Sequence, residues 1–299
     1  MPMLKSQLRG MFPAFPTPFA ADGSLALGKL DGYIESLVNA GIGGLVPVGG
    51  TGEFTALSEA ERVAVTARTV ELARGRVPVV GGILHPGFAD ATALGKALVQ
   101  AGADALMVVA PFYVIPAQAG ILDYYRAYRD KVDADLILYD VPSRTRVSVE
   151  PDTVARLAEE GVIIGMKASN TDAHHFNRLM AAVGDKASIL SGDESVFPTQ
   201  VVLGAVGGVL ASAAIFPRPW NEIMALVAAG KVRDAVALHR SLSALCDALF
   251  CETNPGPLKQ AMKMVGHDFG DVRLPLRSAS PQAVDRLKAL VAQRKSLFF

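Results

Sequence analysis

The sequence has little cysteine and no excess of either charge. Of its 299 residues only Cys246 and Cys251 are cysteines. Their five-residue spacing, in a stretch with helical periodicity, places them on different faces of a helix and out of register for a disulfide or a shared metal ion. We expect two buried free thiols in a reducing compartment. Lysine plus arginine and aspartate plus glutamate both number 29, so the composition does not favour nucleic acid or an anionic membrane as a partner.

Long hydrophobic runs are also missing. No run approaches the roughly 18 apolar residues of a membrane-spanning helix. Lys5, Gln7 and Arg9 interrupt the stretch where a signal peptide would be apolar. We therefore expect a cytoplasmic protein that acts on a small molecule. Hydrophobic residues still make up 51% of the chain and charged residues only 19%, which is enough to bury one large core.

Short apolar runs rich in β-branched residues recur along the chain, and each is followed by a longer stretch with helical periodicity. Their starts lie about 20 to 35 residues apart, the length of one strand, one helix and two loops. Runs without polar alternation are typical of parallel strands buried on both faces. The eight expected strands are 11–15, 45–48, 77–83, 105–110, 136–141, 162–167, 187–190 and 209–212.

Eight strand–helix units predict an α/β fold over residues 1–218, and they fit a closed (β/α)8 TIM barrel better than an open doubly wound sheet, although periodicity alone does not decide closure. Ser58, with Glu61 three residues later, predicts a capping box that starts a helix over 58–73. A second helix, over 90–101, is expected to end at Gly102. Residues 219–299 have a purely helical pattern and are expected to form a C-terminal helical extension on the barrel. It should contain three helices, separated by Pro255, Pro257 and Pro275.

In such a barrel the chemistry lies at the carboxyl ends of the strands. Lys167 ends the run 162–167, where five apolar or small residues precede its side chain. A buried ammonium is costly, and a lysine present as the free amine can attack a carbonyl carbon. Lys167 is therefore a candidate Schiff-base nucleophile, although its position also fits a lysine whose head group reaches solvent.

Two other strand ends carry polar groups. The glycine-rich segment 48–53, VGGTGE, precedes the helix at Ser58, and exposed amides of such a turn suit a carboxylate. Tyr139 ends another strand and could transfer protons, while Arg144 close behind could hold a second carboxylate. Each feature alone also fits a structural role: a tight loop, a core aromatic and a surface ion-pair partner.

In combination these residues resemble the N-acetylneuraminate lyase and dihydrodipicolinate synthase superfamily of class I, Schiff-base aldolases. The resemblance extends over nearly the whole chain. The matching segments are 15–19 (FPTPF), 49–53 (GGTGE), 111–113 (PFY), 139–145 (YDVPSRT), 165–167 (GMK), 190–193 (LSGD) and 254–259 (NPGPLK).

The resemblance implies roles for individual residues. Lys167 would form the imine with pyruvate or another 2-oxo acid, and Tyr139 would be the acid/base phenol. Tyr113 would reach into the site of a neighbouring subunit, which implies a homodimer or a homotetramer. The residues implied in substrate binding are Gly50 and Thr51 through their amides, Arg144 through the carboxylate of an aldehyde such as aspartate semialdehyde, and Gly192 and Val209.

No cofactor is implied, because the imine itself serves as the electron sink. The sequence has no His-x-His or His-Glu-x-x-His arrangement, which disfavours a metal-dependent aldolase. His85 could touch the distal end of a substrate, but a solvated loop histidine fits as well. Phe54 and Pro86 stand where lysine-regulated synthases carry polar residues, so we predict no feedback by lysine.

One position departs from the synthase pattern. Gly50 replaces the first of two hydroxyl residues in the turn, and GGTGEF resembles the turn of keto-deoxy-glucarate dehydratases. The leading hypothesis is a pyruvate-dependent lyase or synthase, nearest to dihydrodipicolinate synthase, that condenses pyruvate with a carboxylate-bearing aldehyde. The second is an aldolase or dehydratase of a 2-keto-3-deoxy sugar acid. The third is a catalytically inactive protein that binds 2-oxo acids.

Overall fold

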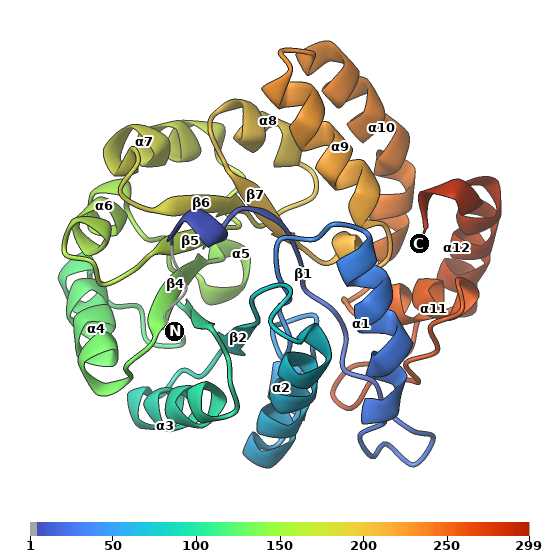
Figure 1. The fold of residues 1–299 in the computed structure, drawn as a ribbon, viewed down its shortest axis with the longest axis horizontal. Helices are drawn as coiled ribbons and strands as arrows, with labels where there is room; N and C mark the ends of the chain where they lie inside the picture. The colour runs from blue at the N-terminus through green and yellow to red at the C-terminus, as the bar shows by residue number, and fades with distance from the viewer. Residues whose placement is uncertain (1–4, 299) are drawn as a thin grey trace.

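Parallel strands surrounded by helices form the centre of the molecule, as a computed structural model of the chain shows for residues 5–298 (Figure 1). The strands pair in the order β1-β7-β6-β5-β4-β3-β2, and every pair is parallel. They are β1 (Gly10–Pro13), β2 (Val80–Ile83), β3 (Ala105–Val109), β4 (Asp135–Asp140), β5 (Gly165–Ala168), β6 (Ser188–Ser191) and β7 (Gly207–Leu210).

The segment expected as the second strand, 45–48, closes the sheet without forming a regular strand. Val46 bridges to Ala14 after β1, and Leu45 bridges to Val79 before β2, both in parallel. The ladder goes no further because Pro47 has no amide hydrogen to donate and Val48 has a left-handed backbone, with φ 50°. The seven strands and this segment therefore form the closed (β/α)8 barrel that the sequence predicts. The segment 45–48 takes the place of the second strand and pairs over fewer residues than expected.

Helices cover the outside of the barrel between successive strands. The capping box is confirmed, because Ser58 Oγ accepts the amide hydrogen of Glu61 while the Glu61 carboxylate accepts that of Ser58. The helices are α1 (Leu30–Asn39), α2 (Glu59–Ala73), α3 (Phe88–Gln100), α4 (Gln118–Lys131), α5 (Pro142–Thr145), α6 (Pro151–Glu159), α7 (Ala173–Val183), α8 (Phe197–Val202) and α9 (Pro217–Ala228).

Three more helices follow α9 and lie together at one side of the barrel (Figure 1). They are α10 (Val232–Leu249), α11 (Gly256–Met264) and α12 (Pro281–Gln293). The expectation of three helices from Pro219 onward was wrong, because α9 and α10 are separate. Gly230, with φ 74°, lies just after the end of α9, and its left-handed backbone turns the chain towards the start of α10. Helix α10 packs on α9 and α8, and α12 packs on α10 and α11.

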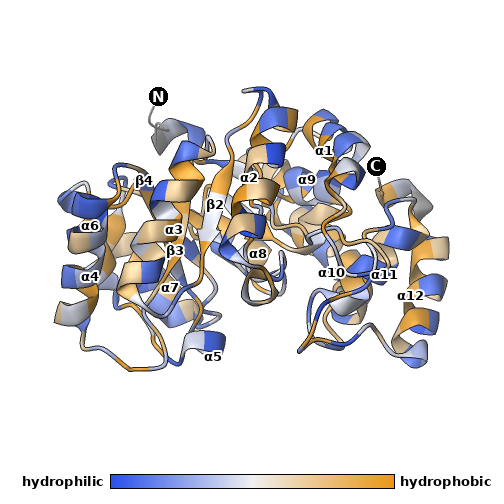
Figure 2. Cartoon of the chain, turned by 90° about the horizontal axis from the view of Figure 1, so that it is seen from below, coloured by the Kyte–Doolittle hydropathy of each residue, from blue (hydrophilic) through white to orange (hydrophobic). Residues whose placement is uncertain are grey.

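Alternate residues of each strand face two different cores. Ile137, Leu190 and Val209 point into the barrel, where they pack with Phe12 and Met107. Their strand neighbours point outward against the helices, so that the strands are buried on both sides. In Figure 2 the helices are banded with polar and apolar residues, which is the amphipathic pattern of a helix covering a sheet.

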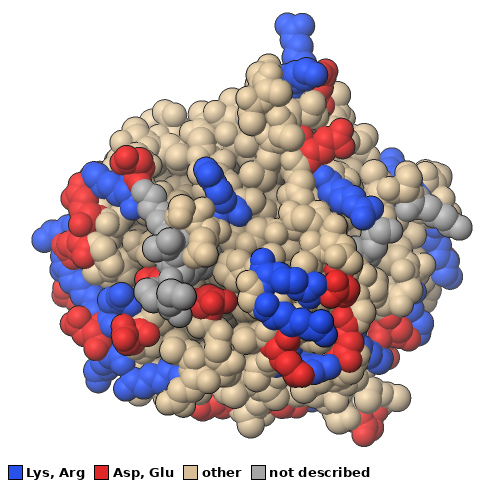
Figure 3. Space-filling model, in the orientation of Figure 1, with Lys and Arg blue, Asp and Glu red and all other residues tan. Residues whose placement is uncertain are grey.

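The surface carries charges of both signs. On the face seen in Figure 3, basic and acidic side chains are interspersed.

Cys246 on α10 is buried and Cys251 is exposed, and both are free thiols. The expectation that both would be buried was wrong for Cys251, because α10 ends at Leu249 before reaching it. Among residues 5–298 no helix is long and apolar enough to span a membrane.

Candidate active site

Lys167 and Tyr139 lie side by side at the carboxyl ends of β5 and β4. They are register partners of two parallel strands, so both side chains point to the same side of the sheet, into the barrel mouth. The Lys167 Nζ atom lies 4.4 Å from the centroid of the Tyr139 ring. Both residues line a cavity of about 440 Å³.

The Lys167 side chain is largely removed from solvent, with 8% of the residue exposed. No carboxylate of residues 5–298 pairs with its ammonium, although its aliphatic part is closely packed. Gly192 explains this packing, since a Cβ atom there would lie 2.9 Å from Lys167 Cγ and 2.0 Å from Ser169 Oγ. The glycine expected to bind substrate therefore lines the cavity and also makes room for the lysine.

The glycine-rich turn faces the same cavity from the opposite part of the barrel. Gly50 and Thr51 both line it, and neither amide donates a hydrogen bond to another group of residues 5–298. Val48 and Glu53, on either side of the turn, have left-handed backbones with φ 50° and 58°. Non-glycine residues in that conformation carry strain and gather at functional sites. The turn thus presents two amides suited to an anion.

Contacts from the C-terminal helices hold this turn in place. Asn254 Nδ2 donates to Thr51 Oγ1 over 3.0 Å. Lys259 on α11 forms an ion pair with Glu53 over 2.7 Å, with both side chains almost fully buried. Burial lowers the pKa of Lys259, and Glu53 opposes this effect. Thr17 Oγ1 donates to the Gly52 carbonyl over 2.6 Å, which fixes the turn from the other side.

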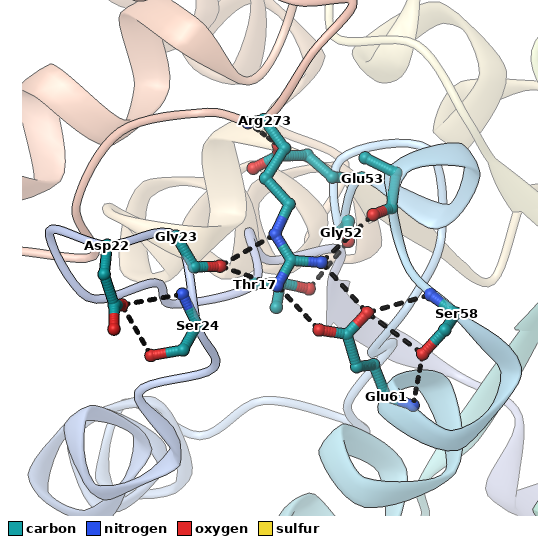
Figure 4. A network of polar contacts seen from close by, with 10 residues as sticks. Thr17, Asp22, Gly23, Ser24, Gly52, Glu53, Ser58, Glu61 and Arg273 are labelled. Carbon is teal, nitrogen blue, oxygen red and sulfur yellow. Dashed lines mark hydrogen bonds and ion pairs between the residues drawn. The ribbon is translucent and has the colours of Figure 1, made fainter.

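Arg273 adds further contacts to this turn and to α2, and Figure 4 shows them in close-up beside Thr17 and Gly52. Its backbone amide donates to Glu53 Oε2 over 2.8 Å. Its guanidinium donates to both Glu61 oxygens and to the Gly23 carbonyl. The Arg273 hydrogen bonds hold the pKa of Glu61 at about 2. The helix that follows the turn, α2, is therefore tied to the chain about 210 residues later.

Arg144 lines the cavity on the short helix α5 and is exposed. It forms no ion pair with any residue of 5–298, so its guanidinium is available to a ligand. The segment that carries it is fixed by Asp140, whose Oδ1 accepts the Val149 amide hydrogen over 3.2 Å. The other oxygen, Oδ2, is buried without a partner among the described residues. Burial raises the pKa of Asp140 to about 7.

Tyr113 is the predicted site residue that does not reach the cavity. It is 94% exposed and has a left-handed backbone, with φ 78°. Its neighbours Val114 and Ile115 are exposed as well, at 68% and 72%, whereas Phe112 lines the cavity. Within one chain the structure brings together Lys167, Tyr139, Gly50, Thr51, Arg144, Gly192 and Val209, and leaves Tyr113 outside.

His85 also lies away from the cavity lining. Its Nε2 atom lies 3.1 Å from Nη1 of Arg62, and its ring packs edge-on against Phe54. A guanidinium has no acceptor, so Nε2 must accept and the imidazole is neutral in this contact. Burial and the neighbouring Arg62 both lower the pKa of His85. Phe54 is buried, and the Cζ atom of the Arg62 guanidinium lies 3.9 Å from the centroid of the Phe54 ring.

Sequence reasoning missed several polar residues of the cavity. Asp193, Glu194 and Thr253 line it, and Glu194 Oε1 accepts hydrogen bonds from the amide and hydroxyl of Ser212. Burial raises the pKa of Glu194. Asn254 stood in a motif that carried the family resemblance, but nothing local indicated that it would meet Thr51. No group of three or more metal-ligating side chains lies together within the described residues.

A model described as the dihydrodipicolinate synthetase family matches residues 7–294. The chain belongs to this family. A relative named 4-hydroxy-tetrahydrodipicolinate synthase, from Haloarcula marismortui, is 36% identical over 291 residues. The match covers 97% of this chain and 95% of that protein.

Solved structures of the family have the same barrel. A chain described as a monomeric dihydrodipicolinate synthase variant superposes with a TM-score of 0.93 at 29% identity, covering 98% of both chains. The chloride-inhibited dihydrodipicolinate synthase of Acinetobacter baumannii, complexed with pyruvate, superposes with a TM-score of 0.91 at 33% identity. That match covers 95% of this chain and 98% of the other. The expected family and the expected fold are thus confirmed.

Proposed function

We propose that this protein is a Schiff-base lyase that condenses pyruvate with a carboxylate-bearing aldehyde, as a 4-hydroxy-tetrahydrodipicolinate synthase does. The observation that carries the proposal is the pairing of Lys167 with Tyr139 at the mouth of a closed barrel. The lysine is buried, and within residues 5–298 it has no counter-ion and the amides of Gly50 and Thr51, which face the same cavity, have no hydrogen-bond acceptor. Relatives that carry the synthase name support it.

The reaction follows from the proposed roles. The Lys167 amine adds to C2 of pyruvate, whose carboxylate the amides of Gly50 and Thr51 hold. Tyr139 supplies the proton with which the carbonyl oxygen leaves as water, giving the imine. The Tyr139 phenolate takes up a proton from C3, which gives the enamine. The enamine forms the new carbon–carbon bond to the aldehyde, and the Tyr139 phenol gives its proton to the aldehyde oxygen. Water then releases the product and restores the amine, so no other cofactor is needed.

Arg144 would bind the carboxylate of the aldehyde, for which aspartate semialdehyde is the first candidate. Gly192 and Val209 would shape the floor of the cavity beside the imine. Gly50, without a hydroxyl, favours the second candidate, an aldolase or dehydratase of a 2-keto-3-deoxy sugar acid. Parallel assays with pyruvate plus aspartate semialdehyde and with a panel of keto-deoxy acids separate the two.

The exposed loop at Tyr113 supports a homodimer, in which this phenol would enter the site of a second copy, and dimers could pair into tetramers. One structural neighbour is a monomeric variant, so the oligomeric state is to be measured by sedimentation.

We further propose a cytoplasmic location, and a division into a barrel at 1–218 and a helical extension at 219–299. Phe54, buried under Arg62, supports the absence of lysine feedback, which calorimetry with lysine would test.

Borohydride trapping tests the imine. We expect the parent protein to gain one reduced pyruvate adduct by intact mass, and Lys167→Ala to gain none. Lys96 is exposed on α3, so Lys96→Ala is the matched control and should trap pyruvate like the parent. An unmodified parent would leave only the binding-protein hypothesis, and an adduct persisting in Lys167→Ala would place the chemistry on another lysine.

A further inference from the structure

Gly50 differs from the other glycines of its turn. At Gly52 an added Cβ atom would lie 2.8 Å from backbone atoms of Val48, so only glycine fits there. At Gly49 it would meet Met107 at an ordinary 3.9 Å. At Gly50 it would meet no atom of residues 5–298 within 4 Å, and Gly50 is not among the glycines with positive φ. Neither the backbone nor the packing therefore requires glycine at this position.

The space over Gly50 belongs to the active-site cavity. Gly50 is exposed there, whereas its neighbours Gly49 and Thr51 are buried. A side chain at this position would stand next to the two amides that would hold the carboxylate of the imine. Its absence enlarges the cavity beside this proposed carboxylate site, and the added space would be open to a carbon chain longer than that of pyruvate.

The walls beyond this space are polar. Asp193, Glu194 and Thr253 line the same cavity. Glu194 is held in position by both the amide and the hydroxyl of Ser212, over 2.9 and 3.0 Å. Fixed carboxylates and a hydroxyl are suitable partners for substrate hydroxyl groups, because each can accept a hydrogen bond from them. A hydroxylated carbon chain fits this lining better than an apolar one.

We propose that Gly50 is a specificity-determining residue, and that the space over it admits 2-oxo acids whose carbon chain continues beyond C3. The keto-deoxy sugar acids are the hydroxylated members of that class. This proposal rests on the proposed imine chemistry at Lys167 and extends it from pyruvate to larger substrates. The role of Gly50 is steric: it leaves room for the chain, while Lys167 and Tyr139 perform the same steps.

Three substitutions separate space from chemistry. Gly50→Ala fills little of the space, whereas Gly50→Val and Gly50→Thr fill nearly the same larger volume and differ in the hydroxyl. Each is compared with the parent in borohydride trapping and in exchange of C3 protons for deuterium by NMR. The substrates are pyruvate and 2-oxobutyrate, which differ by one carbon at C3. Gly32→Ala is the control, because Gly32 lies on α1 with equally open space and outside the cavity.

We expect the parent and Gly32→Ala to process both acids. Gly50→Val and Gly50→Thr should lower the 2-oxobutyrate rate relative to the pyruvate rate by about 10-fold or more, the usual discrimination for one carbon in a closed pocket. Gly50→Ala should have a smaller effect. An equal change for both acids overturns the proposal, as does a gain for pyruvate in Gly50→Thr alone, which would indicate a missing hydroxyl. A parent that traps neither acid refutes the proposed function instead.

Discussion

The two loops that would supply the active site are held very differently. The turn 49–53 is bound by Thr17, Asn254, Lys259 and the Arg273 amide, which come from both ends of the chain. The loop at Tyr113 follows β3 and stands in solvent, with three consecutive large hydrophobic residues exposed. One loop is held by contacts from its own chain, whereas the other is left exposed by the part of the chain that the structure describes.

This difference follows from what each loop must do. Amides that bind a carboxylate are effective only when they are preorganised, and the contacts around Glu53 fix them before any ligand arrives. An exposed apolar segment of this kind marks a surface that another molecule covers. The comparison therefore separates the part of the site that one chain builds from the part for which we propose a second copy. Substitutions in the two loops should differ accordingly in their effect on stability.

The largest effect is expected where the turn is tied to α11. Lys259→Met leaves the Glu53 carboxylate buried without its partner, so the free energy of unfolding should fall by about 3–5 kcal/mol. Lys263 lies on the same helix in an exposed pair with Asp268. Lys263→Met should therefore cost less than about 1 kcal/mol. Urea unfolding measures both, and equal losses would show that the buried pair does not anchor the turn.

An intermediate effect on stability is expected at Asp140, whose hydrogen bond to the Val149 amide fixes the segment that carries Arg144. Its pKa is raised to about 7 by burial, so the folded state holds a proton that the unfolded state releases near pH 4. Between those values the unfolding free energy should fall as pH rises, by up to about 1.4 kcal/mol per pH unit. Asp140→Asn should remove this contribution and make the slope shallower in urea titrations, whereas Asp185→Asn, on the surface, should leave the slope as in the parent. The same slope in all three proteins would contradict the assignment.

Most of the barrel could be predicted from the sequence because its signals are local. Apolar runs predicted eight strands, of which seven are regular in the structure, and the capping box marked the start of α2. The segment 45–48 was expected to be regular, but Pro47 and the left-handed Val48 end its pairing after two residues. The break at Gly230 was missed because the helix ends after Pro219 were expected at prolines alone, whereas here a glycine with φ 74° ends the helix.

The residues of the candidate site also fall into those that local signals predict and those that they do not. Lys167 and Tyr139 could be placed because both end apolar strands, and the alternation of a strand decides which side they face. The support around the turn could not, because Asn254 and Arg273 reach it from more than 200 residues away. Glu194 gave no local signal either. Its buried carboxylate accepts hydrogen bonds from Ser212, which lies just after the next strand, β7.

The smallest effect on stability is expected at the exposed loop. Tyr113→Ala should change the free energy of unfolding by no more than about 0.5 kcal/mol, because the residue is 94% exposed. Tyr125→Ala is the contrast, since that ring is fully buried and its hydroxyl donates to the Val108 carbonyl. It should cost about 3–5 kcal/mol.

Activity tests whether the same tyrosine serves a second copy. Tyr113→Ala and Lys167→Ala should each be inactive alone. In a mixed dimer, however, the site that keeps Lys167 receives Tyr113 from the other subunit, because a twofold interface exchanges the same residue in both directions. Refolding the two variants together at equal amounts should restore about a quarter of the parent activity, since half the dimers are mixed and each has one complete site. If the mixture stays inactive while sedimentation shows dimers, Tyr113 does not act across the interface.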